Sequence, residues 1–281
     1  MNWQTIGFKA QKKYLEQAAK ADNLAHAYLF TGNDMIGKQM FARDLYALVN
    51  GREATVNEPD FKLISPRVEE DETKIYIEDI RDLKSFASLR PYYGPYKFII
   101  INDADRLTPE ASNALLKVLE EPTPKTILIL ISSKSRMLLP TITSRCQHIN
   151  FMSHDEAALI EYMDKLKLSK GDHTLLISMA HGRIGWLQWA TEHIKEIQES
   201  LGDLDKVLKG TLADRMAYAK KIYERETYPT TLANWMYWLH GNRKEIPHAD
   251  RVLKELNRLH LIIAQPQYNH RLALENTLIN L

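Results

Sequence analysis

The sequence predicts an α/β protein in which a parallel sheet domain precedes helical domains. Over residues 1–151, short aliphatic runs alternate with amphipathic helical patterns, an order typical of parallel strands covered by helices on both faces. After Phe151 the β-like runs stop and helical patterns continue. We therefore expect three domains: a sheet domain over residues 1–151, a small helical domain over 152–200 and an all-helical domain over 201–281.

The length and composition agree with a globular chain of two or three domains. A typical domain has about 150 residues, so 281 residues suggest roughly two domains and are enough to bury a sizeable core. The composition, with 44% hydrophobic and 26% charged residues, is ordinary for a globular protein. Lys and Arg number 37 against 36 Asp and Glu, a net charge of +1, so nucleic-acid contact requires a local basic patch. The single cysteine, Cys146, excludes an intramolecular disulfide and any zinc site that needs several thiolates.

The sequence also predicts a soluble protein of the cytoplasm. Its first residues lack the apolar segment that a secretory signal requires. The longest aliphatic runs, at residues 98–101 and 127–131, are too short to span a bilayer. One thiol fits a reducing compartment. We expect no contact with a membrane.

Four aliphatic runs are expected as strands of the sheet. The first three are mostly apolar, which is typical of strands buried on both faces, and the fourth is short. The runs lie at residues 27–32, 97–101, 126–131 and 147–151.

Amphipathic helices are predicted between and after these strands. One follows Lys38, with apolar side chains at i, i+4, i+7 and i+8, and Gly51 ends it. Another begins at Thr108, a capping residue that is followed by proline at the first helical position. In the helical region, Ser153 with Glu156 three residues later forms a capping box, which predicts that the next helix begins at Ser153.

A phosphate-binding loop is the first motif that carries chemistry. Residues 31–39, TGNDMIGKQ, lie between a predicted strand and a predicted helix, with the spacing G-x-x-x-x-G-K through Gly32, Gly37 and Lys38. Such glycines let backbone N–H groups turn toward phosphate, and the lysine meets the β- and γ-oxygens. Gln39 stands where Ser or Thr would hold Mg²⁺. We expect P-loop NTPase geometry without productive MgATP binding; a turn that keeps this shape without its ligand is the alternative.

The second motif is the end of the strand predicted at residues 97–101. ATPases with such a strand place there a Mg²⁺-ligating Asp and a water-polarising Glu. Here the two positions are Asn102 and Asp103. A neutral amide is a poor magnesium ligand, and Asp103 is one methylene shorter than a glutamate base. We therefore expect no metal and no hydrolysis, and Asp103 also fits an ordinary strand-end carboxylate.

The third motif, residues 115–151, carries a family resemblance. It contains Ser144, Arg145 and Cys146 in sequence and is similar to bacterial clamp-loader subunits, AAA+ proteins of the DNA polymerase III holoenzyme. The resemblance implies an AAA+ sheet domain, a helical lid over 152–200 and a helical collar domain over 201–281. Three further segments resemble the same family: residues 24–32, 58–64 and 75–86.

Within that family, the altered residues resemble the non-hydrolysing subunit. The ATP-hydrolysing gamma/tau subunits would carry Ser or Thr at Gln39, acids at Asn102 and the next position, and a second-sensor arginine at Gly185. The resemblance implies that Arg145, with Ser144 beside it, acts as a trans arginine finger in the ATP site of a neighbouring gamma/tau subunit. A permanently charged, forked donor suits that role. A structural ion pair of Arg145 is the alternative.

The resemblance implies a stator in a hetero-oligomer that loads the sliding clamp on primed DNA. Its partners would be gamma/tau and delta subunits, with clamp and DNA reached through the complex. We expect no required cofactor, and no zinc because residues 51–58, where many relatives carry a four-cysteine module, hold no cysteine. The alternative is an active AAA+ ATPase, gamma/tau-like or a fork-remodelling helicase relative, that binds ATP with Gly32, Gly37 and Lys38 and uses Asp103 as base. A nucleotide-sensing adaptor that binds ATP without hydrolysis is a third hypothesis.

Overall fold

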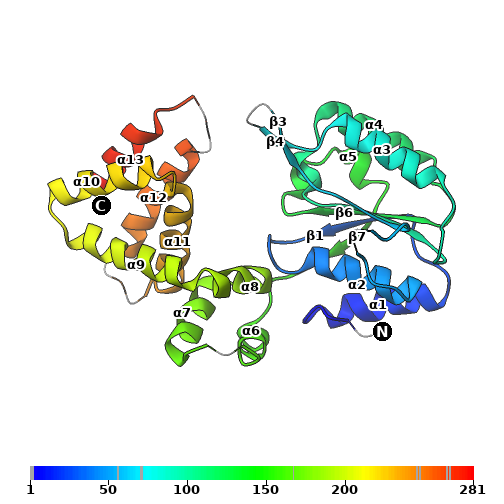
Figure 1. The fold of residues 1–281 in the computed structure, drawn as a ribbon, viewed down its shortest axis with the longest axis horizontal. Coiled ribbons are helices and arrows are strands. Elements are labelled where there is room, and N and C mark those ends of the chain that lie inside the picture. The colour runs from blue at the N-terminus through cyan, green and yellow to red at the C-terminus, as the bar shows by residue number, and fades with distance from the viewer. Residues whose placement is uncertain are drawn as a thin grey trace. The chain divides into compact units, whose positions relative to one another are not determined.

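The chain forms two compact units in a computed structural model that describes residues 3–55, 57–69, 72–166, 168–244, 246, 248–263, 265 and 267–281. The first unit combines Met1–Ala158 with Gly182–Gly185, and the second combines Leu159–His181 with Trp186–Leu281. The first is built around a sheet, and the described part of the second is helical (Figure 1). The further division into a lid and a collar domain stays a prediction.

The sheet of the first unit has five parallel strands in the order β2-β5-β6-β1-β7. All four predicted strands are confirmed, as β1, β5, β6 and β7, and β2 was not predicted. Strands β5 and β6 are buried along their whole length, as the uninterrupted apolar runs indicated. The bounds are β1 Ala27–Thr31, β2 Phe61–Ile64, β5 Lys97–Ile101, β6 Thr126–Ser132 and β7 Gln147–Asn150.

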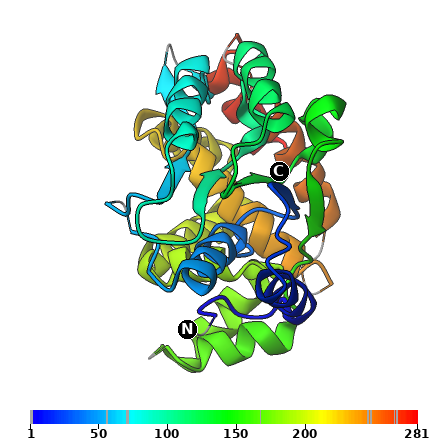
Figure 2. The same ribbon diagram turned by 90° about the vertical axis from the view of Figure 1, so that its right-hand side faces the viewer.

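Helices cover both faces of this sheet (Figures 1 and 2). Because side chains alternate along a strand, β5 sends Ile99 and Ile101 toward α3 and α4, and Phe98 and Ile100 toward α1 and α2. The α/β architecture predicted from the sequence is thus confirmed. The helix bounds are α1 Lys9–Lys20, α2 Lys38–Asn50, α3 Ile77–Ser88, α4 Pro109–Glu120 and α5 Pro140–Thr143.

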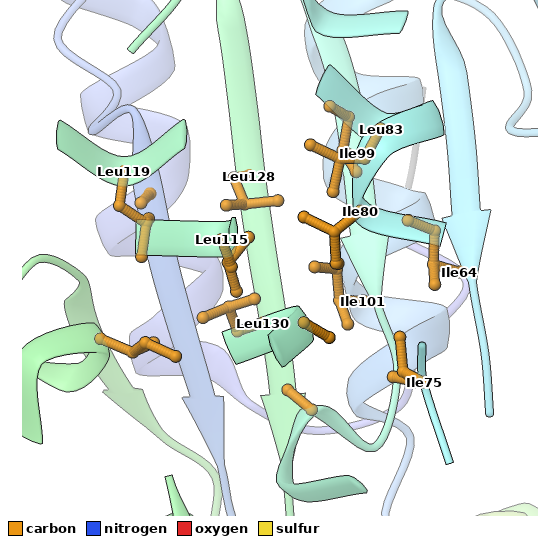
Figure 3. Packing of buried hydrophobic residues seen from close by; sticks show 14 of the residues in the cluster. Ile64, Ile75, Ile80, Leu83, Ile99, Ile101, Leu115, Leu119, Leu128 and Leu130 are labelled. Atoms are coloured by element: carbon orange, nitrogen blue, oxygen red, sulfur yellow. The ribbon is translucent and has the colours of Figure 1, made fainter. Parts of the chain in front are cut away.

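The apolar cluster beneath α3 and α4 is one of the two cores of the sheet domain. Figure 3 shows Leu115 of α4 between Leu128 and Leu130 of β6, and Ile80 of α3 next to Ile101 of β5. All five side chains are at least nine-tenths buried. Burial of this kind holds α4, and hence the residues at its C-terminal end, firmly on the sheet.

Two short strands and two 3-10 turns also belong to the first unit. Strands β3 (Arg67–Glu69) and β4 (Glu72–Lys74) form an antiparallel pair, and the 3-10 turns η1 (Ala104–Arg106) and η2 (Ser135–Met137) follow β5 and β6. The turn η1 begins directly after Asp103, so it orients the residues at the end of β5.

The helix starts were predicted with mixed success. Thr108 caps α4 as expected, because its side chain accepts a hydrogen bond from the backbone N–H of Ala111 at 3.2 Å. The capping box at Ser153 was wrong. Helix α6 begins at Glu156, and the carboxylate of Asp155 accepts from the N–H of Ala158. The hydroxyl of Ser153 instead contacts the phosphate loop, as described below.

The second unit is built from a succession of helices. Trp235 of α11 lies wholly buried in its core, and the indole N–H donates to the carbonyl oxygen of Ser200 at 2.7 Å. Among the described residues, no helix combines the length and the apolar character needed to cross a bilayer. The helix bounds are α6 Glu156–Met163, α7 Lys170–Ala180, α8 Ile184–Glu192, α9 Ile194–Lys209, α10 Leu212–Glu224, α11 Tyr228–Gly241, α12 Ala249–Ile263 and α13 His270–Ile279.

Candidate functional site

The phosphate loop joins β1 to α2, in the strand–loop–helix context that the spacing predicted. Gly32 has φ 141° and Gly37 has φ 104°, both in the region that favours glycine. A side chain at Gly32 would also place its Cβ 2.2 Å from the carbonyl oxygen of Phe151. Gly37 is the N-cap residue of α2, and Lys38 is the first residue of that helix. Both glycines are therefore required by the loop conformation.

The side chain of Lys38 folds back onto the loop itself. Its ammonium donates to the carbonyl oxygens of Gly32 at 2.7 Å and Asn33 at 2.6 Å, and the residue is only 5% exposed. Burial lowers the pKa of Lys38, although the carboxylates of Asp34 and Asp103 favour the charged form. The ammonium is thus held at the phosphate loop, where the lysine of this motif meets phosphate oxygens when a nucleotide is bound.

Asn102 and Asp103 follow β5 and lie near the loop. The Asn102 amide donates to the Asp103 carboxylate at 3.3 Å, and Asp103 adopts a left-handed φ of 48°. Burial, with repulsion from Asp34 and Asp105, raises the pKa of Asp103. Among the described residues, no group of three or more His, Cys, Asp and Glu side chains is arranged to hold a metal ion.

A third part of the site is the end of β6. Ser132 is wholly buried, and its hydroxyl donates to the carboxylate of Asp105 while it accepts from the backbone N–H of Lys134 at 3.0 Å. Both hydrogen bonds are made within the chain, so the hydroxyl is committed to positioning Asp105 and the turn after β6.

The phosphate loop is also held from outside. The backbone N–H of Gly185 donates to the Met35 carbonyl at 2.7 Å, and the His154 ring nitrogen Nε2 bonds the carbonyl oxygen of Ile36 at 2.9 Å. The Asn33 amide donates to the hydroxyl of Ser153 at 3.0 Å. His154 and Ser153 were not predicted as parts of the site, because His154 belongs to no motif and Ser153 was assigned to a capping box.

Arg145 lies on the turn after α5, where it forms an ion pair. Its Nη2 donates to the carboxylate of Glu120 at 2.8 Å and its Nη1 to the carbonyl oxygen of Thr141 at 2.9 Å. The side chain is 36% exposed and that of Glu120 is 50% exposed. The hydroxyl of Ser144 donates to the same carbonyl oxygen of Thr141. The ion pair left open by the sequence is present, in a half-exposed position.

Cys146 follows as a packed and unreactive thiol. It is partly buried against the core beneath α4. Burial raises the pKa of Cys146 to about 12, so the thiol stays protonated at neutral pH. A nucleophilic cysteine needs the thiolate.

The predicted site residues therefore form two groups. Gly32, Gly37, Lys38 and Asp103 meet around the phosphate loop, where Asp103 contributes to the electrostatic field at Lys38. Arg145 and Ser144 form the other group, and within the described part of the chain neither makes a hydrogen bond or ion pair to the first.

Comparisons with known proteins identify relatives of the sheet domain. A family model described as DNA polymerase III, delta subunit, matches residues 7–155. The chain is 32% identical over 184 residues to DNA polymerase III subunit delta-prime of Bacillus subtilis, which covers 60% of this chain and 55% of the relative. It is 34% identical over 160 residues to the delta-prime subunit of Pseudomonas aeruginosa, an alignment that covers 51% of this chain and 44% of that subunit. The chain thus spans about half the length of these curated relatives.

A subunit of the tau type is similar as well. DNA polymerase III subunit tau of Bacillus subtilis is 31% identical over 194 residues, an alignment that covers 63% of this chain and 34% of that subunit. Identity alone therefore does not separate the delta-prime and tau types.

Two solved structures show the fold. A gamma subunit-related protein of DNA polymerase III from Thermotoga maritima has a TM-score of 0.63 at 21% identity and covers 94% of this chain and 97% of that one. The AAA domain of FIGL-1 in complex with ADP has a TM-score of 0.51 at 18% identity, with 72% and 76% covered. The predicted AAA+ sheet domain with a C-terminal helical region is confirmed. Because the family model matches just over half of the 281 residues and the delta-prime subunits are among its relatives, the chain belongs to the DNA polymerase III delta subunit family as a delta-prime-like clamp-loader subunit.

Proposed function

We propose that this clamp-loader subunit is a non-hydrolysing stator that supplies Arg145 to the ATP site of a neighbouring gamma/tau subunit. The observation that carries the proposal is a contrast within the chain. The phosphate loop and the end of β5 carry neutral amides, Gln39 and Asn102, at the two positions where an ATPase of this fold holds Mg²⁺, whereas Arg145 lies half-exposed and away from that loop. This contrast supports a role for the charge of Arg145 at a site outside this chain.

The residues around the phosphate loop support the absence of hydrolysis. Phosphoryl transfer requires Mg²⁺ to neutralise charge on the β- and γ-oxygens. The two positions where an ATPase of this fold holds that ion carry neutral amides, Gln39 and Asn102. Asp103 is left as a carboxyl that is hydrogen-bonded by Asn102 and whose pKa is raised by burial and neighbouring acids.

The segment at Gly185 supports the same conclusion. The family resemblance implies that hydrolysing subunits carry a second-sensor arginine at this position. A Cβ atom on Gly185 would lie 2.7 Å from the carbonyl oxygen of Met35, which is closer than van der Waals contact allows. A long side chain therefore has no room at this position without a shift of the phosphate loop.

Arg145 has the chemistry that a trans finger needs. A guanidinium stays charged at all relevant pH values and presents five N–H donors in a planar fork that matches phosphate oxygens. Such a group stabilises the charge that develops as the γ-phosphoryl group transfers. Ser144 supports the turn by its hydrogen bond to Thr141 and is a part of the same signature.

We also propose the setting in which the subunit works. Its partners would be gamma/tau and delta subunits, and it would reach the sliding clamp and primed DNA through the assembled complex. We propose that the chain needs no cofactor of its own and binds no zinc, while ATP binding without hydrolysis stays open to test. The cytoplasmic location stays a prediction.

The test is the ATPase rate of a complex reconstituted with cognate gamma/tau and delta subunits, stimulated by clamp and primed DNA. Arg145→Ala should lower the rate on the order of 10³-fold at the one site it serves, and the summed rate less, because other sites keep their own fingers. Arg136→Ala is a matched control, since Arg136 is an exposed arginine of the turn after β6. Equal rates for Arg145→Ala and wild type, in a complex that still assembles, would overturn the proposal.

The competing hypothesis is that this chain is an active ATPase, and ATP hydrolysis and ATP binding by the purified chain test it. Hydrolysis by the purified chain alone, abolished by Lys38→Ala, would favour that hypothesis. Tight ATP binding without hydrolysis, with a change in partner affinity, would favour the adaptor.

A further inference from the structure

Glu120 is a candidate partner for the function of Arg145. It is the last residue of α4, a helix held on the sheet by Leu115 and Leu119. A negative charge at a helix C-terminus is disfavoured by the helix dipole, so the helix alone gives no reason for a carboxylate here. The contact that stabilises this charge is the 2.8 Å ion pair with Arg145.

The ion pair and one further hydrogen bond together orient the guanidinium. Nη2 of Arg145 is held by Glu120 and Nη1 by the carbonyl oxygen of Thr141. Two contacts on different nitrogen atoms define both the position and the rotation of a planar group. These contacts use two of the five N–H donors, which leaves the other donors of the fork for a phosphate group.

Because the ion pair is exposed, it can orient the Arg145 side chain while contributing little to the stability of the fold. Both side chains are at least one-third exposed, Arg145 by 36% and Glu120 by 50%. Ion pairs at such positions contribute little to folding, because water screens the attraction and the side chains lose rotational freedom. The pair is therefore weakly tied to stability and well placed to restrict a long, flexible side chain.

We propose that Glu120 is a positioning residue for Arg145, which it orients toward the ATP site of the neighbouring subunit. The inference rests on the proposed function of Arg145 as a trans finger. A free arginine side chain would lose conformational entropy when it engages the transferring phosphoryl group. An arginine that is already oriented loses less, so a greater part of its interaction stabilises the transition state.

The test compares Glu120→Ala, Glu120→Gln and the control Glu121→Ala in the reconstituted, DNA-stimulated complex. Glu121 is the exposed neighbour at the C-cap of α4 and makes no ion pair among the described residues. The quantity to compare is the Arg145-dependent part of the ATPase rate, which is the rate of the wild-type complex minus the rate of the Arg145→Ala complex. Glu120→Ala should reduce that part about tenfold, because a misplaced catalytic group loses rate steeply. Glu120→Gln should retain most of it because the amide oxygen still accepts from Nη2, and Glu121→Ala should retain all of it.

A double variant and two parameters exclude a merely structural role. In the Arg145→Ala background, Glu120→Ala should cause no further loss, because the two residues then act as one unit. The loss in the single variant should fall on kcat with the KM for ATP unchanged. Urea unfolding of each variant should confirm that it is folded. If Glu120→Ala does not fold, Glu120→Ser, which also removes the acceptor of Arg145 Nη2, replaces it and should show the same loss.

The outcomes separate the two proposals. If Arg145→Ala lowers the rate and Glu120→Ala does not, or if Glu120→Ala raises it, the positioning role is overturned and the finger stands. A further loss in the double variant also overturns the positioning role, because Glu120 then acts without Arg145. If Arg145→Ala itself leaves the rate unchanged, both proposals fail.

Discussion

The backbone N–H of Gly185 donates to the carbonyl oxygen of Met35 at 2.7 Å, which joins the start of α8 to the phosphate loop. Met35 has a positive φ of 59°, a conformation uncommon for a residue other than glycine. The hydrogen bond therefore holds a loop residue in an unfavourable conformation, and the absence of a side chain at position 185 makes this close approach possible.

Gly185→Ala should destabilise the chain by about 1–3 kcal/mol, because the added Cβ would meet the Met35 carbonyl at 2.7 Å and the backbone must shift. Urea unfolding measures the difference. Gly202→Ala in α9 is the control. The added Cβ would meet no atom within 4 Å, so alanine in the helix should raise the free energy of unfolding by about 0.5–1 kcal/mol. A Gly185→Ala variant as stable as wild type would show that the loop yields easily at this contact.

Lys38→Met should destabilise the chain by about 1–3 kcal/mol, because two loop carbonyls lose the ammonium that they bind. The exposed Lys13→Met on α1 should change stability by less than about 0.5 kcal/mol. Thermal or urea unfolding tests both variants. In the reconstituted complex, Lys38→Met should leave the stimulated ATPase rate unchanged wherever assembly is intact, and a large loss would instead indicate a working nucleotide site in this chain.

Asp103→Asn should stabilise the chain at neutral pH. Burial and the nearby Asp34 and Asp105 raise the pKa of Asp103 above the ordinary 3.8, so the folded state binds this proton more strongly than the unfolded state does. The stability contributed by protonated Asp103 is therefore fully present below pH 3.8 and is lost as the pH rises through the pKa of Asp103 in the folded state. Asparagine also tolerates the left-handed backbone conformation of this position.

The check is the free energy of unfolding of wild type and Asp103→Asn across acid and neutral pH. The advantage of the variant should be present at neutral pH and should shrink as the pH falls toward 3.8. Asp82→Asn, exposed on α3, serves as the control and should show no such trend. An advantage that is independent of pH would contradict the electrostatic explanation.

Arg145→Ala should change the stability of the isolated chain by at most about 1 kcal/mol, because its pair with Glu120 is half-exposed. Thermal unfolding of the chain and size-exclusion chromatography of the complex check this prediction. A large destabilisation would mean that Arg145 acts as a structural residue, and a lower ATPase rate could then not be assigned to the finger.

Most of the sheet could be predicted from the sequence because its strands are uninterrupted apolar runs. Strand β2, FKLI, was missed because it has four residues, contains Lys62 and lies at the edge of the sheet, where burial is incomplete. The β3–β4 pair was missed for a related reason, since its described residues are mostly charged, are largely exposed and show no apolar pattern. Local patterns indicate burial, and these segments have little of it.

The site was predictable where it depends on spacing and unpredictable where it depends on packing. The glycines and Lys38 of the phosphate loop follow from their spacing, and Gln39 and Asn102 stand out against it. The partners that decide what these residues do come from distant segments. Glu120 lies 25 residues before Arg145, and His154 lies 118 residues after Ile36. Nothing local marks either residue as a partner.

The neutral amides of Gln39 and Asn102 have a consequence for how this chain would respond to the energy supply of the cell. A nucleotide that entered the loop would find an amide at each of the two positions that hold Mg²⁺ in an ATPase of this fold, so the contribution of the metal to binding would be missing. Swings between ATP and ADP would then leave this domain largely unaltered. In the complex proposed above, such a domain would serve as the stationary reference against which the other subunits move.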